Sequence, residues 1–254
     1  ASDVYKRQIA TVLILPKEPS SAEQPNQLFD RSQVLDQLRP PAHAPEFSRV
    51  FAARTCMMAG VGLTGVFLWY LVRFWVYGKA VVLTSAPLTI PAGFLIAGMA
   101  VATLIGAALA SWAAGPISER IEEKNIPVAR VVAGACLLYA AGLALAWGLG
   151  VWSTGTAREN GMLLFALISG FAFGVYDSLG LELVMDSLPD PRRAGHDLGI
   201  YALANSAGLA LAAIIGALLV NAFEHSFGYY LLFPSAIVMV LLAGIVTLTT
   251  KSAE

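Results

Sequence analysis

Three carboxylates lie within one apolar stretch, GVYDSLGLELVMD, at positions 174–186. They belong to Asp177, Glu182 and Asp186. An ionised acid in hydrocarbon costs about 2.5–3.5 kcal/mol on insertion scales, so one kept at that depth normally faces water, a partner or a ligand. Carboxylates in such a setting can accept hydrogen bonds from the hydroxyl groups of a ligand or take up a proton.

The depth of each acid follows if residues 161–187 form a membrane-spanning helix. Counted from a midpoint near Gly174, Asp177 lies about 5 Å away, Glu182 about 12 Å and Asp186 roughly 18 Å, at the hydrated interface. Glu182 is rotated by roughly 140° from Asp177, so the two do not share a face. We therefore expect one of them to face a cavity and the other to pair locally, with Arg192 or Arg193 as partners for Glu182.

The composition indicates a membrane protein. Hydrophobic residues make up 57% and charged residues 13% of the 254 residues, with a mean hydropathy of +0.68. A soluble domain carries about a quarter charged residues. The net charge of -1 gives no basic excess, so no nucleic-acid partner is expected.

Six apolar segments have roughly the 20 residues that a helix needs to cross a bilayer. We predict spans at 50–75, 90–114, 128–150, 161–187, 198–221 and 229–249. The connections are rich in Pro, Gly and charge, which interrupt helices. Because only helices and closed barrels satisfy their backbone groups in lipid, the predicted fold class is an all-α membrane protein with six transmembrane helices.

Lys and Arg are distributed unequally between the two ends of these spans. If the residues before the first span face the cytoplasm, that side collects most of them, including Arg49, Arg54, Arg120 and Arg130. The opposite side keeps only Arg73, Lys79 and Arg158. The positive-inside rule then places the N-terminal loop and the C-terminus in the cytoplasm.

Small residues recur at every fourth position in two of the spans, which lets helix backbones approach closely. The stripe in 90–114 is Gly98, Ala102, Gly106, Ala110 and Ala114. The stripe in 198–221 is Ala204, Gly208, Ala212 and Gly216. We expect the helix-packing sites to be Gly98, Gly106, Gly208 and Gly216.

Enzyme motifs receive no support. GVGLTG at 60–65 has the spacing of a dinucleotide site, but it follows no predicted strand and lies within an apolar segment. The histidines fall in loops without an HExxH motif, and Cys56 and Cys136 fall in apolar segments, as is typical of buried free thiols. We predict that the protein is not an enzyme and has no metal or cofactor.

Three ordered pieces of the sequence carry a family resemblance. They are PEFSRVFAARTCMMAGVGLTGVFLWYLVRFW at 45–75, GPISERIEEK at 115–124 and MDSLPDPRRAGHDLGIYALANSAG at 185–208. Together they resemble the C-terminal half of a major facilitator superfamily transporter, especially the bacterial sugar-cation symporters. The resemblance implies helices 7 to 12 of a twelve-helix fold, in which helices 8 and 11, the ones with the small-residue stripes, pack across the two halves.

The same resemblance suggests a division of the chain. Residues 1–15 would hold ASDVYKRQ, which resembles translated adapter sequence, and the end of a truncated helix 6. Residues 16–49 would be the central cytoplasmic loop, 50–250 the six-helix domain and 251–254 a cytoplasmic tail. The implied location is a bacterial inner membrane, and the implied partner is a missing N-terminal six-helix half.

The implied function is secondary active transport of a small solute, a sugar with a coupling proton or cation, by alternating access. Efflux of a drug or metabolite and a non-transporting six-helix assembly are the alternatives. Asp177 would line the pathway, although a purely structural role stays open, and Asn205 would either bond a neighbouring helix or face the solute. The candidate pathway residues are Asp177, Glu182, Asn205, Trp69, Tyr70 and Tyr176; for Trp69 and Tyr70 an aromatic belt is the ordinary interpretation.

The piece GPISERIEEK resembles the signature cytoplasmic motif of the superfamily. It keeps Gly115 and Arg120, has Glu119 where Asp is usual, and replaces the usual Gly-Arg-Arg with residues 121–123. We expect Gly115, Glu119 and Arg120 to form a conformation-dependent charge latch. An ordinary solvated turn is the alternative.

Overall fold

The computed structural model describes residues 45–77, 89–152, 155–188 and 194–250. In these ranges the chain is helical and contains no strand, which confirms the predicted all-α class. The elements are α3 (Pro45–Gly65), α4 (Leu68–Tyr70), the π-helical segment η2 (Leu71–Val76), α5 (Thr89–Glu123), α6 (Val128–Trp152), α7 (Thr156–Asp186), α8 (Ala194–Ala222) and α9 (Glu224–Leu248).

Five of the described helices are long and apolar enough to cross a membrane, namely those at 91–123, 128–152, 156–186, 194–222 and 228–248. The segment predicted at 50–75 is not one continuous helix: α3 ends at Gly65, and the chain continues through α4 and η2. Glycine weakens a helix, and Arg49 and Arg54 lower the hydropathy of α3. The first predicted span is therefore broken, whereas the other five are each a single helix.

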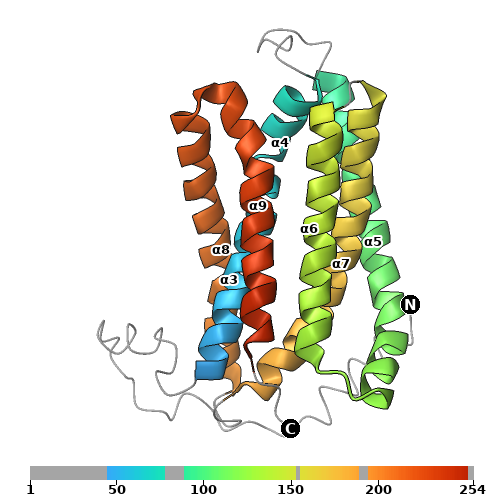
Figure 1. Cartoon of the computed structure of the whole chain (residues 1–254), viewed down its shortest axis with the longest axis vertical. Coiled ribbons are helices and arrows are strands. Elements are labelled where there is room, and N and C mark those ends of the chain that lie inside the picture. The colour runs from blue at the N-terminus through green and yellow to red at the C-terminus, as the bar shows by residue number, and fades with distance from the viewer. Residues whose placement is uncertain (1–44, 78–88, 153–154, 189–193, 251–254) are drawn as a thin grey trace, which may run out of the picture. The chain divides into compact units, whose positions relative to one another are not determined.

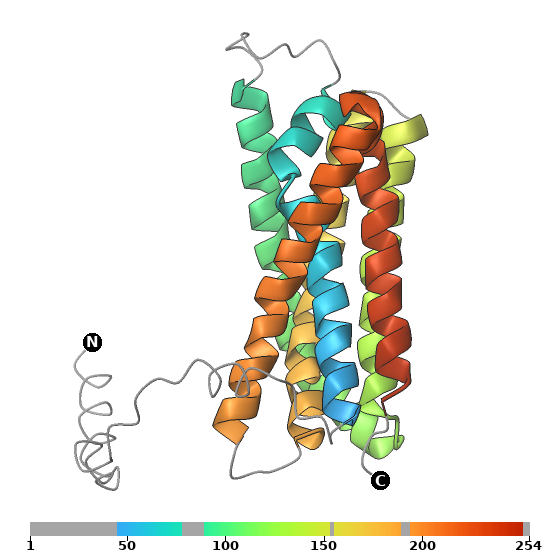
Figure 2. The same cartoon turned by 90° about the vertical axis from the view of Figure 1, so that its left-hand side faces the viewer.

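The long helices form two groups of three. Helix α3 packs against α8 and α9, while α7 packs against α5 and α6 (Figure 1). The groups meet along α6 and α9, and the view turned by 90° shows the helices running along one common direction (Figure 2). Fully buried side chains such as Met57, Leu143 and Phe233 fill the core, whereas Trp112 on α5 is 80% exposed. Outward apolar side chains of this kind suit contact with lipid.

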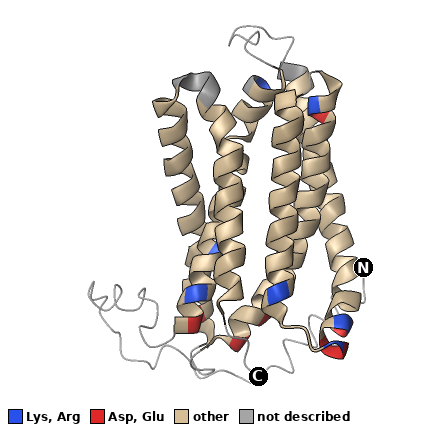
Figure 3. Cartoon of the chain, in the orientation of Figure 1, with Lys and Arg blue, Asp and Glu red and all other residues tan. Residues whose placement is uncertain are grey.

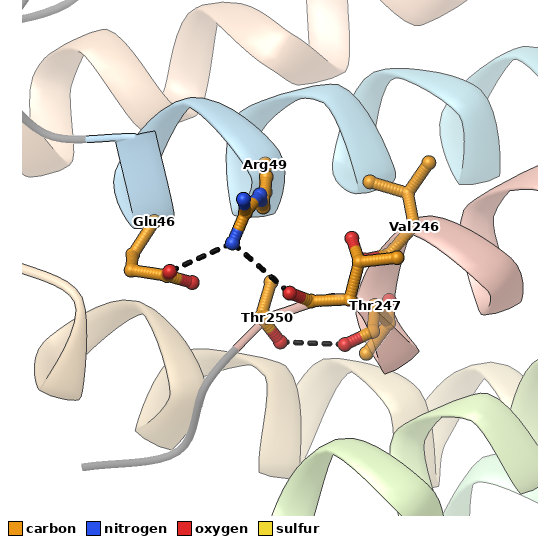
Figure 4. Close-up of polar contacts among 6 residues, drawn as sticks. Glu46, Arg49, Val246, Thr247 and Thr250 are labelled. Atoms are coloured by element: carbon orange, nitrogen blue, oxygen red, sulfur yellow. Dashed lines mark hydrogen bonds and ion pairs between the residues drawn. The ribbon is translucent and has the colours of Figure 1, made fainter.

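Charged residues lie mainly near the two ends of the bundle (Figure 3). At one end Arg49 Nη1 lies 2.7 Å from Glu46 Oε1 and donates to the carbonyl oxygen of Thr249 at 3.0 Å (Figure 4). The start of α3 and the end of α9 therefore lie at the same end of the bundle. Which side of the membrane that end faces remains a prediction.

The small-residue stripe of α5 faces α7. A Cβ at Gly106 would collide with the carbonyl oxygen of Leu167, and a Cβ at Gly170 on α7 would collide with that of Thr103. The backbones of α5 and α7 thus touch directly, as small residues permit. Gly98 lies farther along the same contact, where its Cβ would be 3.2 Å from the Leu163 side chain.

The stripe of α8 faces α3. A Cβ at Gly208 would lie 2.5 Å from Met58 Cβ and 2.7 Å from the Thr55 carbonyl oxygen, and one at Gly216 would collide with the Phe67 ring. Both stripes are therefore occupied by neighbouring helices of this chain. That α5 and α8 also pack across two halves stays a prediction.

The signature-like piece at 115–124 belongs almost entirely to a helix, although the sequence indicated a connecting loop. Helix α5 continues through Pro116 to Glu123. The turn that follows is short because Asn125 takes φ 49°, a left-handed conformation that Asn tolerates better than most residues. The predicted loop thus shrinks to the few residues between Glu123 and Val128.

The close contact of α5 with α7 generates a stability prediction. Gly106→Ala should destabilise the protein by about 1–3 kcal/mol, because the added methyl group must push two backbones apart. Gly93→Ala on the same helix is the matched control, since its Cβ would meet nothing within 4 Å. Thermal unfolding of the purified protein in detergent measures both variants, and equal melting temperatures would contradict the contact.

Candidate functional site

An arginine inside the bundle organises the site. Arg54 on α3 places Nη1 2.7 Å from Asp177 Oδ1 on α7, and its Nε donates to Asn205 Oδ1 on α8 at 2.8 Å. The Arg54 side chain is only 9% exposed, whereas that of Asp177 is 55% exposed. The pair therefore joins a buried cation to an accessible carboxylate.

Three aromatic rings complete the surroundings of this guanidinium group. Its Cζ lies 5.7 Å from the ring centre of Phe173, 5.6 Å from that of Tyr176 and 5.7 Å from that of Tyr201. Phe173, Tyr176 and Asp177 come from adjacent turns of α7, where residues three and four apart share a face. Ring faces attract cations within about 6 Å, so all three contribute to holding Arg54.

The arrangement answers an energetic requirement. A buried charge is expensive unless it is paired and hydrogen-bonded. Arginine suits this position because its flat guanidinium group can donate in two directions within its plane and present its faces to rings, which a lysine ammonium group cannot do. Asp177, Asn205 and the rings together compensate the burial of Arg54.

A cavity of about 350 Å³ lies beside Asp177. It is lined by Val61, Thr103, Ala107, Ser111, Tyr139, Ser169, Gly170, Phe173, Gly174, Asp177 and Ser178. These residues come from α3, α5, α6 and α7, so the cavity lies where the two groups of helices meet. Its volume falls within the usual range for small-molecule sites.

The polar lining of the cavity consists mostly of acceptors. Ser178 Oγ donates to the Gly174 carbonyl oxygen at 2.8 Å, Thr103 Oγ1 to that of Met99 at 2.9 Å, and Ser169 Oγ to that of Ala166 at 3.1 Å. Because their protons are used within their own helices, these hydroxyl groups keep lone pairs for a ligand. With the Asp177 carboxylate, the cavity therefore suits a molecule that carries several donors.

The structure brings three of the predicted pathway residues together. Asp177 lines the cavity, Tyr176 is buried beneath Arg54, and Asn205 bonds Arg54 without lining the cavity. Of the two roles considered for Asn205, the described geometry shows the bond to a neighbouring helix. The Asp177 side chain is 55% exposed, so this acid is not fully buried.

Other predicted residues lie elsewhere. Glu182 is exposed, and its expected partners Arg192 and Arg193 lie outside the described residues. Trp69 and Tyr70 do not line the cavity, and the Tyr70 ring stacks on Tyr229 with centres 6.2 Å apart.

The residues of the predicted charge latch lie at the end of α5. Gly115, Glu119 and Arg120 lie on exposed final turns of α5. Within the ranges that the structure describes, neither charged side chain has an ion-pair partner. The latch stays a prediction about another conformation.

Arg54 is the residue of this candidate site that the sequence did not single out. Charge counting groups it with the other basic residues near the start of the first span, and the structure adds that its side chain lies inside the bundle. The available signal was its position within the apolar helix segment, where an arginine needs a partner. The described residues contain no group of three or more His, Cys, Asp or Glu that could hold a metal ion.

The fold and cavity define a helical membrane protein with an internal polar site. The model of the Major Facilitator Superfamily matches residues 92–254, more than half of the chain, and the chain belongs to this family of membrane transporters. No curated protein and no solved structure matches it. Helix α3, which supplies Arg54, precedes the matched residues.

The pairing of Arg54 with Asp177 predicts a measurable coupling energy. A double-mutant cycle of Arg54→Met and Asp177→Asn should give about 1–3 kcal/mol, because removing either partner leaves the other without its counter-charge. The half-exposed pair Glu46 and Arg49 at the end of the bundle is the control and should give about 0.2–1 kcal/mol. Unfolding in detergent supplies the four free energies of each cycle, and an equal coupling in both pairs would contradict the role assigned to Arg54.

Proposed function

We propose that this chain forms the C-terminal half of a secondary active transporter that moves a small, hydroxyl-rich solute by alternating access. A sugar is the first choice. The observation that carries the proposal is the cavity beside Asp177, whose polar lining of one carboxylate and several hydroxyl oxygens matches the donors of such a solute. Membership of the transporter family supports the same conclusion.

The chemistry of binding would resemble that of other sites for neutral hydroxylated molecules. Asp177 uses Oδ1 toward Arg54, but a carboxylate has about four acceptor positions, so it can also accept from a solute hydroxyl group. Phe173 and Tyr139 offer apolar surface to the C–H face of the solute. The hydrogen bonds would then orient the solute, and the rings would exclude water from its C–H face.

A coupling proton or cation at Asp177 belongs to the same proposal. Arg54 already supplies the counter-charge of this carboxylate. A proton or cation that binds there must therefore compete with Arg54. Coupling at Asp177 thus requires the two side chains to separate during the cycle.

The proposed setting is a twelve-helix protein in a bacterial inner membrane, with an N-terminal six-helix half facing the cavity and both ends of this chain in the cytoplasm. The exposure of Asp177 within an otherwise apolar bundle supports a partner on that side. Recovery of the upstream reading frame tests this part. Six further apolar spans would support it, and an upstream stop codon followed by a start at the described helices would contradict it.

A second candidate function is efflux of a metabolite or drug-like solute that carries an amine. The specific observation is that Asp177 lines the same cavity as the Phe173 and Tyr139 rings, a combination that also suits an ammonium group. The direction of transport and the charge of the solute separate the two candidates.

Transport by reconstituted protein tests the proposed role of Asp177. Proteoliposomes holding the product of the complete reading frame should accumulate radiolabelled D-glucose, D-galactose, lactose or melibiose under an imposed proton or sodium gradient. Asp177→Asn should reduce accumulation by about tenfold or more, the equivalent of one charge-assisted hydrogen bond.

Asp186→Asn is the matched control, because Asp186 is the exposed last residue of the same helix. It should accumulate the sugar like the wild type. Undiminished uptake by Asp177→Asn would contradict the role of this acid. Extrusion of ethidium without uptake of any sugar would favour the efflux candidate.

A further inference from the structure

The two groups of helices are joined unevenly. Helices α6 and α9 pack along each other, whereas α3 and α7, on the side of the cavity, meet at few points. There the connection is polar: Asn205 on α8 accepts from Arg54 on α3, and Arg54 pairs with Asp177 on α7. One chain of hydrogen bonds thus links three helices across the boundary between the groups.

Only one member of this chain is open to a solute. Asp177 lines the cavity and is 55% exposed, whereas Arg54 is 9% exposed and neither it nor Asn205 lines the cavity. A solute that enters can therefore reach the link at the Asp177 carboxylate alone. Any effect of Asn205 on the cavity must pass through Arg54.

We propose that Asn205 and Arg54 are positioning residues that tie the group of α3, α8 and α9 to the group of α5, α6 and α7 on the cavity side. We further propose that a solute engaging Asp177 opens this tie, a part that rests on the proposed function. The solute hydroxyl groups and Arg54 compete for the same carboxylate. Occupation of the cavity thereby changes how firmly the two groups are held together.

The surroundings of Arg54 make the opening reversible. When Asp177 turns to a solute, Arg54 keeps its bond to Asn205 and its contact with the Tyr201 ring, which both belong to α8. The contacts with the Phe173 and Tyr176 rings of α7 also remain, so the loss of Asp177 weakens the link between the groups without leaving the cation unpartnered. Closure needs only the return of the Asp177 carboxylate.

Pulsed electron paramagnetic resonance tests the tie without reference to transport. Nitroxide labels are placed at Leu181→Cys on α7 and Leu203→Cys on α8, which are exposed positions on the two groups, with Cys56→Ser and Cys136→Ala as background. The protein from the complete reading frame should give a narrow distance distribution. Asn205→Ala should broaden it at least about twofold, because Arg54 loses the bond that fixes it.

Two further variants exclude a general loss of structure. Asn205→Asp keeps an oxygen acceptor for Arg54 Nε and should restore the narrow distribution. Asn221→Ala makes the same substitution at an exposed position near the far end of α8 and should change nothing. An unchanged distribution in Asn205→Ala, or broadening in Asn221→Ala to the same extent, overturns the tie.

A mixture of D-glucose, D-galactose and lactose serves as the solute probe. The control is the same buffer without sugar. Broadening of the wild-type distance distribution by the mixture, relative to this control, supports opening by a solute. If Asn205→Ala broadens the distribution and the mixture does not, the tie stands and opening by a sugar is overturned. Failure of the proposed function is thereby distinguished from failure of the tie.

Discussion

The burial of one guanidinium group constrains the rest of this structure. Arg54 lies in an apolar helical bundle, where an unpaired charge would be prohibitively costly, so its partners must all be in place. Asp177 provides the counter-charge and Asn205 an acceptor, while rings from α7 and α8 cover its faces. The requirement fixes the relative positions of α3, α7 and α8, and it holds a carboxylate at the wall of the cavity.

Close helix packing supplies the rigid frame on which this site depends. Gly106 and Gly170 bring α5 and α7 into backbone contact, and Gly208 does the same for α3 and α8. The first contact positions the cavity wall that carries Asp177, and the second positions Arg54 beside Asn205. Apolar packing thus holds each group together and joins α6 to α9, while a polar link joins α3 to α7 on the side of the cavity.

Much of the fold was predictable because span length and apolar composition report directly on the bilayer. Five spans and the candidate acid Asp177 follow from that signal. The break after Gly65 and the helical continuation past Pro116 do not, because local breakers act only where tertiary packing fails to override them. The contacts of Arg54 do not follow either, since charge counting places a residue relative to the membrane but names no partner. The partner lies 123 positions away, on another helix.

A solute bound in the cavity beside Asp177 would cover the side chains of its wall. The most direct measurement is the alkylation rate of Ser178→Cys, on the cavity wall next to this acid, by N-ethylmaleimide with and without the transported sugar. We expect protection by about fivefold or more at saturating sugar, because an occupied cavity excludes the reagent. Leu181→Cys, an exposed position on the same helix, is the reference. An alkylation rate of Ser178→Cys that is the same with and without sugar would contradict binding in this cavity.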